Sequence, residues 1–235
     1  MTRVVDVLNR AARQCSITPP SSWLTSAEPV VREIIDFLEE TVDDVLERVD
    51  VVQPISKKLI ITGLDQEAYA LPSNYKRLTR GEFAVYERFR TRRACVPVSD
   101  DGQWEYIKEL GTAGAYRFFR VRGYDENHFI DFQRPLEAGI SVVVHYVSKN
   151  WICGQKAEFT QEEDEIALPR RLIEAGIVFR FRERKGLEFT DKQAEYEAIL
   201  ARMINDSRTR RVLNFGAVAG RHPWDIPIPD FIPPT

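Results

Sequence analysis

The sequence lacks a long hydrophobic run, and a membrane-spanning helix would need about 20 consecutive apolar residues. The first six residues include Arg3 and Asp6, where a signal peptide needs its apolar core. We therefore expect a protein without membrane contact, made in the cytoplasm or part of something assembled there.

Cysteine and histidine are also scarce. The three cysteines lie far apart without a C-x-x-C pair, and the three histidines form no metal-ligand spacing, so zinc sites and thioredoxin-like motifs are not indicated. Neither a P-loop nor a G-x-S-x-G motif occurs. We expect reduced thiols, no metal, no cofactor and no catalytic residue. A pair of carboxylates brought together only by folding stays open, because sequence spacing does not test it.

The charge balance gives little sign of a nucleic-acid binder. The net charge of the 235-residue chain is -3, so contact with a polyanion would need a local basic patch. Residues 76–93 contain seven basic and two acidic residues, and Arg88, Arg90 and Arg92 would share one face of a strand. Arg120 and Arg122 repeat this spacing. The cluster is either a solvated sheet face or a surface that contacts acidic protein or phosphates without reading bases.

Helical periodicity occupies the N-terminal part. Residues 2–16 form a first expected helix, which ends at Pro19 and Pro20. A second begins near Ser26 as N-cap and carries apolar residues at steps of three and four up to Val49. Its other surface is acidic, which indicates either a solvated face or contact with a basic neighbour.

From residue 57 to about 151 the pattern predicts strands. A Pro72 stop separates a strand at 69–71 from a restart at 75–78, and Ser99–Gly102 predicts a turn before a strand at 104–107. The other expected strand segments are 59–61, 83–86, 94–98, 116–121, 129–132 and 140–147. His145 lies within the last of these runs and is interpreted as a sheet histidine. Short strands at this spacing are typical of an antiparallel sandwich or small barrel.

Helix returns near Pro169, which is expected at the first helical position. Residues 178–182 also alternate like a strand, but the i, i+4, i+8 apolar spacing and Gly186 favour helix. A capping-box pattern at Thr190 starts a last helix. The acidic run at 162–165 lacks the ligand pattern of a calcium loop and is interpreted as a solvated loop.

The end of the sequence differs from the rest. Residues 221–235 contain five prolines, which exclude a helix and a central strand, yet they are too apolar for a solvated linker. We interpret residues 214–235 as an extended docking arm for a groove in a partner, with wrapping onto its own body as the alternative. The expected docking residues are Trp224, Ile226, Ile228, Phe231 and Ile232.

Five segments, taken in order, give the sequence a family resemblance. They are Tyr-x-Leu-Pro-x-Asn-Tyr-x-Arg-Leu at 69–78, Phe-Ile-Asp-Phe-x-x-Pro at 129–135 followed by Ala138-Gly139, Val-x-Tyr-x-Ser-Lys-x-Trp at 144–151, Leu-Pro-x-x-Leu-Ile at 168–173, and Arg-x-x-Lys-Gly-Leu at 182–187. Over roughly residues 1–213 the chain resembles the head-to-tail adaptor (connector) proteins of tailed bacteriophages.

The resemblance implies an α+β fold: an antiparallel bundle of about four helices with a β domain inserted between the second and third. The expected parts are residues 1–55 and 152–213 for the bundle, 56–151 for a sandwich- or barrel-like insertion, and 214–235 for the arm. It also implies a ring, usually of twelve copies, beneath the portal protein, with C-terminal segments docked on the portal, a downstream tail protein bound below and viral DNA passing through.

We therefore expect a structural virion protein at the head–tail junction and not an enzyme. Its partners would be the portal protein, a tail protein, copies of itself and non-specifically held double-stranded DNA. Arg88, Arg90, Arg92, Arg120 and Arg122 are candidates for ring or DNA-channel contacts, and the acidic second helix is a candidate to meet the Arg-rich strands of a neighbouring copy. Tyr69, Leu71 and Tyr75 are expected to anchor the insertion to the bundle. The alternatives are a virion-associated cell-wall hydrolase and a free nucleic-acid-binding module.

Overall fold

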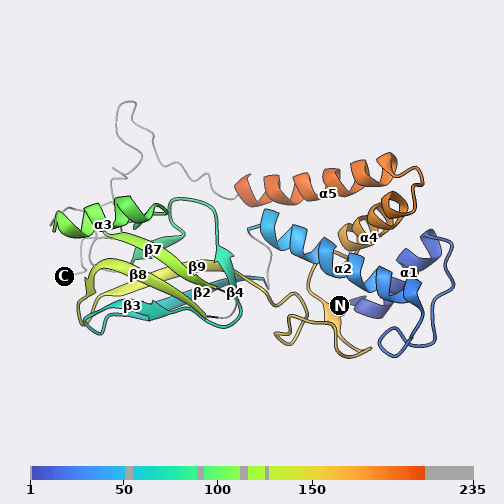
Figure 1. Cartoon of the computed structure of the whole chain (residues 1–235), viewed down its shortest axis with the longest axis horizontal. Helices are drawn as coiled ribbons and strands as arrows, with labels where there is room; N and C mark the ends of the chain where they lie inside the picture. Colours follow the sequence, from blue (N-terminus) through green and yellow to red (C-terminus); the bar gives the residue numbers. More distant parts are fainter. Residues whose placement is uncertain (1, 51–54, 89–92, 112–115, 125–126, 210–235) are drawn as a thin grey trace, which may run out of the picture.

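The chain has a mixed α+β fold. The structure, a computed structural model, describes residues 2–50, 55–88, 93–111, 116–124 and 127–209. Four of the described helices pack together on one side, and two four-stranded sheets lie on the other (Figure 1). We call these the helical region and the sheet region, the latter comprising residues 56–148. None of the described helices is long and apolar enough to span a membrane.

The helical region is built from α1 (Val4–Gln14), α2 (Pro29–Arg48), α4 (Arg170–Arg184) and α5 (Thr190–Thr209). Their apolar faces meet in one core, because residues three and four apart project from the same side of a helix. Its largest fully buried members include Trp23, Leu8, Ile34, Leu38, Leu172, Ile173 and Tyr196. Side chains of this kind each contribute about 1.5–3 kcal/mol when buried.

The helix boundaries differ slightly from expectation. The N-cap of α2 is Glu28 rather than Ser26, whose hydroxyl instead accepts a hydrogen bond from the Glu28 N–H at 3.3 Å. Pro169 is the N-cap of α4 and precedes its first turn. Residues 178–182 are helical, and Gly186, with a φ of 67°, follows the end of α4 as predicted.

The first sheet follows the order β2 (Ser56–Thr62), β9 (Ser141–Ser148) and β4 (Tyr75–Leu78), with β5 (Val85–Glu87) also paired to β9. All of its pairings are antiparallel. β9 carries the most β-branched run of the sequence and is the central strand, in agreement with the preference of such side chains for pleated, buried surfaces.

The second sheet follows the order β3, β8, β7 and β6. Its strands are β3 (Gln66–Ala70), β8 (Asn127–Leu136), β7 (Phe118–Tyr124) and β6 (Val96–Pro97). The β6–β7 pair is parallel, which departs from the expected all-antiparallel arrangement. A further short pair joins β1 (Thr2–Arg3) to β10 (Glu165–Ile166) beside the helices.

Apolar side chains of the two sheets form a second core. It contains Ile61, Val142 and Val144 from the first sheet together with Phe119, Ile130 and Phe132 from the second. The segment 69–78 joins the sheets, because β3 ends before Pro72 and β4 starts at Tyr75 in the other sheet. The stop and restart predicted around Pro72 are thus confirmed, and they mark a change of sheet.

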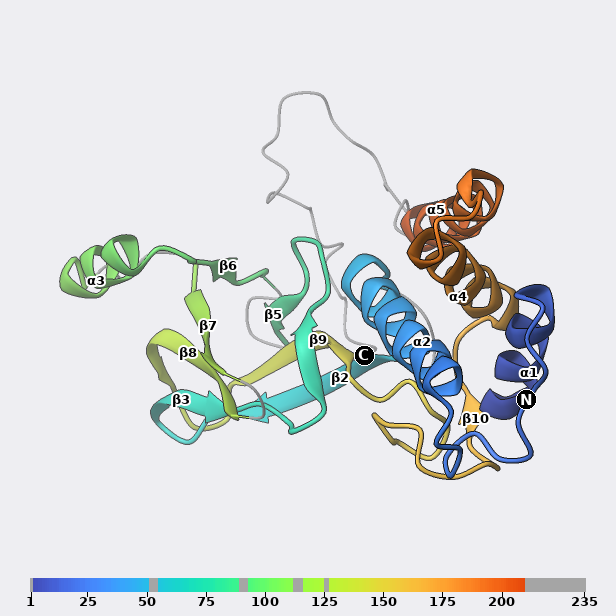
Figure 2. The same ribbon diagram turned by 45° about the vertical axis from the view of Figure 1, so that its right-hand side comes forward.

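One expected strand is wrong. Residues 104–107 belong to α3 (Asp101–Glu109), which lies at the far end of the sheet region (Figure 2). The Asp100 carboxylate accepts a hydrogen bond from the Gln103 N–H at 2.6 Å, so the sequence interpreted as a turn is a helix N-cap. Trp104 and Ile107 are buried, as residues three apart on one helix face can be, while Tyr106 is 62% exposed. Each of the other expected strand segments overlaps a strand of the structure.

A candidate junction centred on helix α2

Arg77 of β4 closes the C-terminal end of α2. Its Nε donates to the carbonyl of Leu46 at 2.9 Å and its Nη2 to the carbonyl of Val49 at 3.1 Å, while Nη1 bonds the carboxylate of Asp50 at 2.6 Å. The last carbonyls of a helix have no partner within the helix and carry partial negative charge. One guanidinium from the sheet region satisfies two of them, so the end of α2 and the start of β4 are fixed together.

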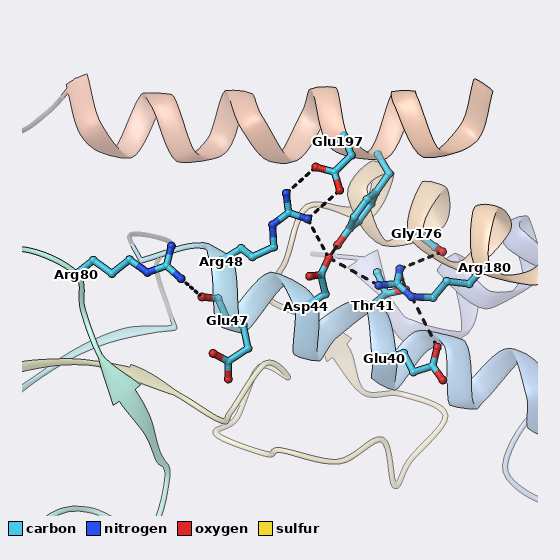
Figure 3. A network of polar contacts seen from close by, with 10 residues as sticks. Glu40, Thr41, Asp44, Glu47, Arg48, Arg80, Gly176, Arg180 and Glu197 are labelled. Atoms are coloured by element: carbon cyan, nitrogen blue, oxygen red, sulfur yellow. Dashed lines mark hydrogen bonds and ion pairs between the residues drawn. The ribbon is translucent and has the colours of Figure 1, made fainter. Parts of the chain in front are cut away.

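Two further basic side chains on or next to β4 reach the same end of α2. Lys76 Nζ lies 2.6 Å from a carboxylate oxygen of Asp43 and 3.7 Å from one of Glu47. Arg80 donates to the main-chain carbonyl of Glu47 at 2.9 Å (Figure 3). The three basic residues lie close together in sequence, Lys76 and Arg77 on β4 and Arg80 just after it. We call Lys76, Arg77 and Arg80 the β4 clamp.

Another face of the C-terminal half of α2 contacts α4 and α5 (Figure 3). Arg48 holds the two carboxylate oxygens of Glu197 with bonds of 2.8 and 2.6 Å, the bidentate geometry that suits a guanidinium. The Tyr196 hydroxyl donates to Asp44 at 2.5 Å. These contacts join α5 to α2 at the edge of the helical core.

Arg180 of α4 lies inside this junction and its side chain is only 14% exposed. It donates to the Thr41 hydroxyl at 3.0 Å, and its guanidinium lies 4.6 and 5.5 Å from the ring centroids of Phe179 and Tyr196. Asp44 is 3.7 Å away. A cation held between aromatic faces and a carboxylate is a stabilising arrangement, and no reacting group is needed to explain it.

A glycine makes the close approach of α4 to α2 possible. A Cβ on Gly176 would lie 2.2 Å from Thr41 Cγ2 and 3.1 Å from the Tyr196 ring. The Thr41 hydroxyl in turn donates to the carbonyl of Phe37 at 2.6 Å, which fixes the threonine rotamer. The two helices therefore meet at a point where a larger residue has no room.

The junction shifts two titrating groups. The hydrogen bonds from Arg48 hold the pKa of Glu197 below its ordinary value. Burial, followed by the hydrogen bond and charge of Asp44, raises the pKa of Tyr196. Both shifts favour the charge states in which the α2–α5 contacts form at neutral pH.

The structure separates the arginines that the sequence grouped. Arg120 and Arg122 lie on β7 and both approach the buried carboxylate of Asp131, at 3.4 and 2.6 Å. Their guanidinium groups also lie over the rings of Trp104 and Phe129. Because each is already held by an acid and an aromatic ring, contact with phosphates would compete with these bonds.

Arg88 follows β5 of the first sheet and is exposed, and its main-chain N–H donates to the carbonyl of Ser141 at 2.8 Å. Arg90 and Arg92 lie outside the described residues, so their predicted shared face is not described. Arg88 therefore belongs to one sheet, while Arg120 and Arg122 belong to the other. The arm with Trp224, Ile226, Ile228, Phe231 and Ile232 also lies outside the described residues.

Two expectations about the junction need correction. Tyr69, Leu71 and Tyr75 do not anchor the sheet region to the helices: they pack in the second core, where Tyr75 lies 5.0 Å from the His128 ring. The β4 clamp makes polar contacts across this junction, and Val147 of β9 is buried in the core of the helical region. The second expectation was that the acidic face of α2 meets a neighbouring copy. In the structure, Asp43 and Asp44 form ion pairs with basic residues of the same chain.

The acidic run at 162–165 is not a solvated loop. Glu162 accepts hydrogen bonds from the Ser22 hydroxyl and from the N–H groups of Trp23 and Leu24, at 2.8, 2.8 and 3.2 Å. Asp164 is buried and accepts from two N–H groups of its own loop. Glu162 therefore orders the connection that leads into α2, whereas Asp164 orders its own loop. The partners of Glu162 lie about 140 residues away in sequence, so no local signal in the sequence predicts this role.

No group of three or more metal-binding side chains occurs among the described residues. A hollow of about 320 Å³ is lined by Leu78, Asp100, Asp101, Arg120 and Arg122, among others.

His145 lies on β9 as predicted, stacked on Tyr86 with ring centroids 6.0 Å apart. The burial of this imidazole and the charge of Lys58 lower its pKa.

Comparison with known proteins adds no family: no family model matches the chain, and no curated protein matches its sequence.

Proposed function

We propose that this chain is a structural head-to-tail adaptor of a tailed bacteriophage, which forms a ring beneath the portal and links it to the tail. In this proposal the helical region is the bundle and the sheet region is the insertion between its second and third helices. The arm docks on the portal, and viral DNA passes through the ring. The protein acts in the virion without catalysing a reaction.

One observation carries the proposal: segments that suggest the family by sequence contact one another in space. The Asn74 side chain accepts a hydrogen bond from the Tyr146 hydroxyl at 3.1 Å, and the main-chain carbonyl of Asn74 accepts from the main-chain N–H of Lys149 at 2.8 Å. Tyr75 and Tyr146 pack with ring centroids 5.8 Å apart. The same 69–78 segment supplies Lys76 and Arg77 of the β4 clamp.

The layout supports an insertion. Residues 56–148 have an apolar core distinct from that of the helices, and they leave and rejoin the helical region close together, since the Ser148 N–H donates to the carbonyl of Ile55 at 3.0 Å. An element with adjacent ends can be placed in a loop without disturbing its host. The β4 clamp then sets its position on α2.

The hydrolase alternative has less support. A glycoside hydrolase needs two carboxyl groups flanking a cleft, one of them with a raised pKa. Burial raises the pKa of Glu39 and of Glu174, but these residues lie on α2 and α4, away from the residues that line the described hollow. Glu174 also has Arg170 and Arg10 as ionic neighbours.

Binding to immobilised portal rings tests the proposal. We expect the full chain to bind, and a chain lacking residues 216–235 to keep its cooperative unfolding transition and lose binding, because the apolar arm is the docking element. Wild-type affinity of the shortened chain would remove the arm from the docking surface. Failure of the full chain to bind the portal of the same phage would contradict the adaptor function itself.

A further inference from the structure

Strand β2 presents the longest open edge in the first sheet. It ends the path β2, β9, β4, and within the described ranges no strand pairs with its outer side. The carbonyl of Ile55 accepts from Ser148 and the N–H of Gly63 donates to Ile140, so odd-numbered residues direct their main-chain groups toward β9. By alternation, Ser56, Lys58, Ile60 and Thr62 direct theirs outward.

This edge has few of the features that protect exposed strands. It is seven residues long, without a bulge in its pairing to β9, and Ile60 is 42% exposed. The charge of Lys58 is the main feature of this strand that opposes pairing with a further strand. A long open edge with an exposed apolar residue is a template for an added strand.

The arm has the complementary pattern. Every proline from Pro223 to Pro233 occupies an odd-numbered position. In an extended segment, residues two apart direct their main-chain groups to the same side, so the even-numbered residues from His222 to Ile232 form one edge with an N–H at every position. The opposite edge is interrupted by prolines, which are tolerated in a strand only where it faces solvent.

Side chains and charge agree with this pairing. Trp224, Ile226 and Ile228 would share one face of the added strand. Asp225 and Asp230 bring two negative charges to a strand that carries Lys57 and Lys58. Residues 210–221 connect the end of α5 to the arm and reach about 40 Å when extended.

We propose that, in the isolated protein, residues 222–232 of the chain's own arm add to the outer edge of β2 as an edge strand. Attachment to the same chain raises the effective concentration of the arm to the millimolar range for a short linker. The prolines on the far side then stop any further strand from joining, so the arm also shields the sheet from edge-to-edge association. The inference concerns the isolated chain and does not rest on portal binding.

Residue-resolved amide hydrogen exchange of the full chain tests the pairing. We expect the Lys58, Ile60 and Thr62 amides to be protected in the wild type and to exchange at least about tenfold faster in Ile228→Pro, because the new proline removes an N–H from the pairing edge. Phe231→Pro is the matched control: it places a proline on the far edge, and protection stays. The amides of Lys57 and Leu59, which face β9, report that the sheet is intact in every variant.

Three outcomes would overturn the proposal. The first is rapid exchange of the Lys58, Ile60 and Thr62 amides in the wild type, and the second is an equal response to the two proline variants. The third is protection that disappears on tenfold dilution, whereas protection that survives dilution identifies the arm of the same chain as the added strand. Because no portal is present, none of these outcomes bears on whether the chain is an adaptor.

Discussion

Helix α2 contacts α4 and α5 through one face of its C-terminal half and the β4 clamp through another face and its terminal carbonyls, and these two junctions are built differently. The first combines close packing at Gly176 and Thr41 with a polar network around Asp44. The second consists of long basic side chains that bond carboxylates and helix-end carbonyls. Close packing is prominent where the helices meet, whereas long basic side chains, together with the buried Val147 of β9, hold the sheet region to the helices.

The difference matters for a protein proposed to act within a ring. Packed interfaces have few alternative arrangements, whereas the geometry of a junction made by side-chain bonds depends on the few residues that form them. We therefore expect the helical region to behave as a unit and the β4 clamp to set the orientation of the sheet region. Substitutions that alter one junction at a time distinguish the two.

The largest effect is expected from Gly176→Ala. The added Cβ would lie 2.2 Å from Thr41 Cγ2, so the helices must separate, and we expect a loss of about 3 kcal/mol in the free energy of unfolding. Urea denaturation measures it. Adding Thr41→Ser removes Cγ2 while keeping the hydroxyl, so the double variant should recover part of the loss. If Gly176→Ala alone has wild-type stability, close packing does not hold the first junction.

Next comes Arg77→Ala, which removes three bonds of the β4 clamp and leaves Asp50 and two helix-end carbonyls without this partner. We expect a loss of about 2 kcal/mol in the free energy of unfolding. Arg77→Lys should recover little, because an ammonium group cannot reproduce the forked geometry.

A matched control for the clamp is Arg122→Ala, which removes a half-exposed arginine of the sheet region that does not contact α2. Small-angle scattering of the two variants distinguishes a local loss from a change of orientation. We expect a broader distribution of interatomic distances for Arg77→Ala only. Identical profiles for Arg77→Ala and the wild type would mean that the clamp does not orient the sheet region.

A smaller effect is expected from Tyr196→Phe, which removes the hydrogen bond to Asp44 and costs about 1 kcal/mol. Because the pKa of Tyr196 is raised in the folded state, its contribution is fully present below the ordinary tyrosine pKa of about 10 and is lost as the pH rises above it. The stability of the variant should thus fall less steeply above pH 10. Parallel curves for the two proteins would contradict this assignment.

The smallest effect is expected from Glu197→Gln. Both partners of the Arg48–Glu197 pair are more than one-third exposed, so we expect a loss below about 1 kcal/mol that shrinks further at high salt. The pKa of Glu197 is lowered, so its contribution is present above the ordinary value and is lost as the pH falls through the lowered one. Thermal unfolding at pH 7 and pH 3 should show a smaller difference between wild type and variant at pH 3.

The sequence predicted the helices of the first junction because their apolar residues recur at three and four over many turns. It also predicted most strands, and the stop at Pro72. It failed at α3, where Asp100 and Gly102 resemble a turn and Trp104 and Tyr106 resemble the alternating face of a strand. Whether such a local pattern forms a strand or a helix depends on which side chains become buried. Here Trp104 is buried against Val98 and Phe118, which favours the helix.

The site was less predictable than the fold. The basic cluster around residue 76 was visible, but its partners lie on α2, about thirty residues earlier in the chain. Spacing in sequence does not show that a strand passes the end of a helix. The same limit applies to Glu162, whose partners at residues 22–24 are distant in sequence.

The adaptor proposal is tested most directly by the mass of the purified protein, measured by light scattering alone and after mixing with portal rings of the same phage. We predict a monomer alone and a single large complex with the portal, in which several copies, twelve in the usual ring, join one portal. A protein that stays monomeric in the presence of portal rings would contradict the account.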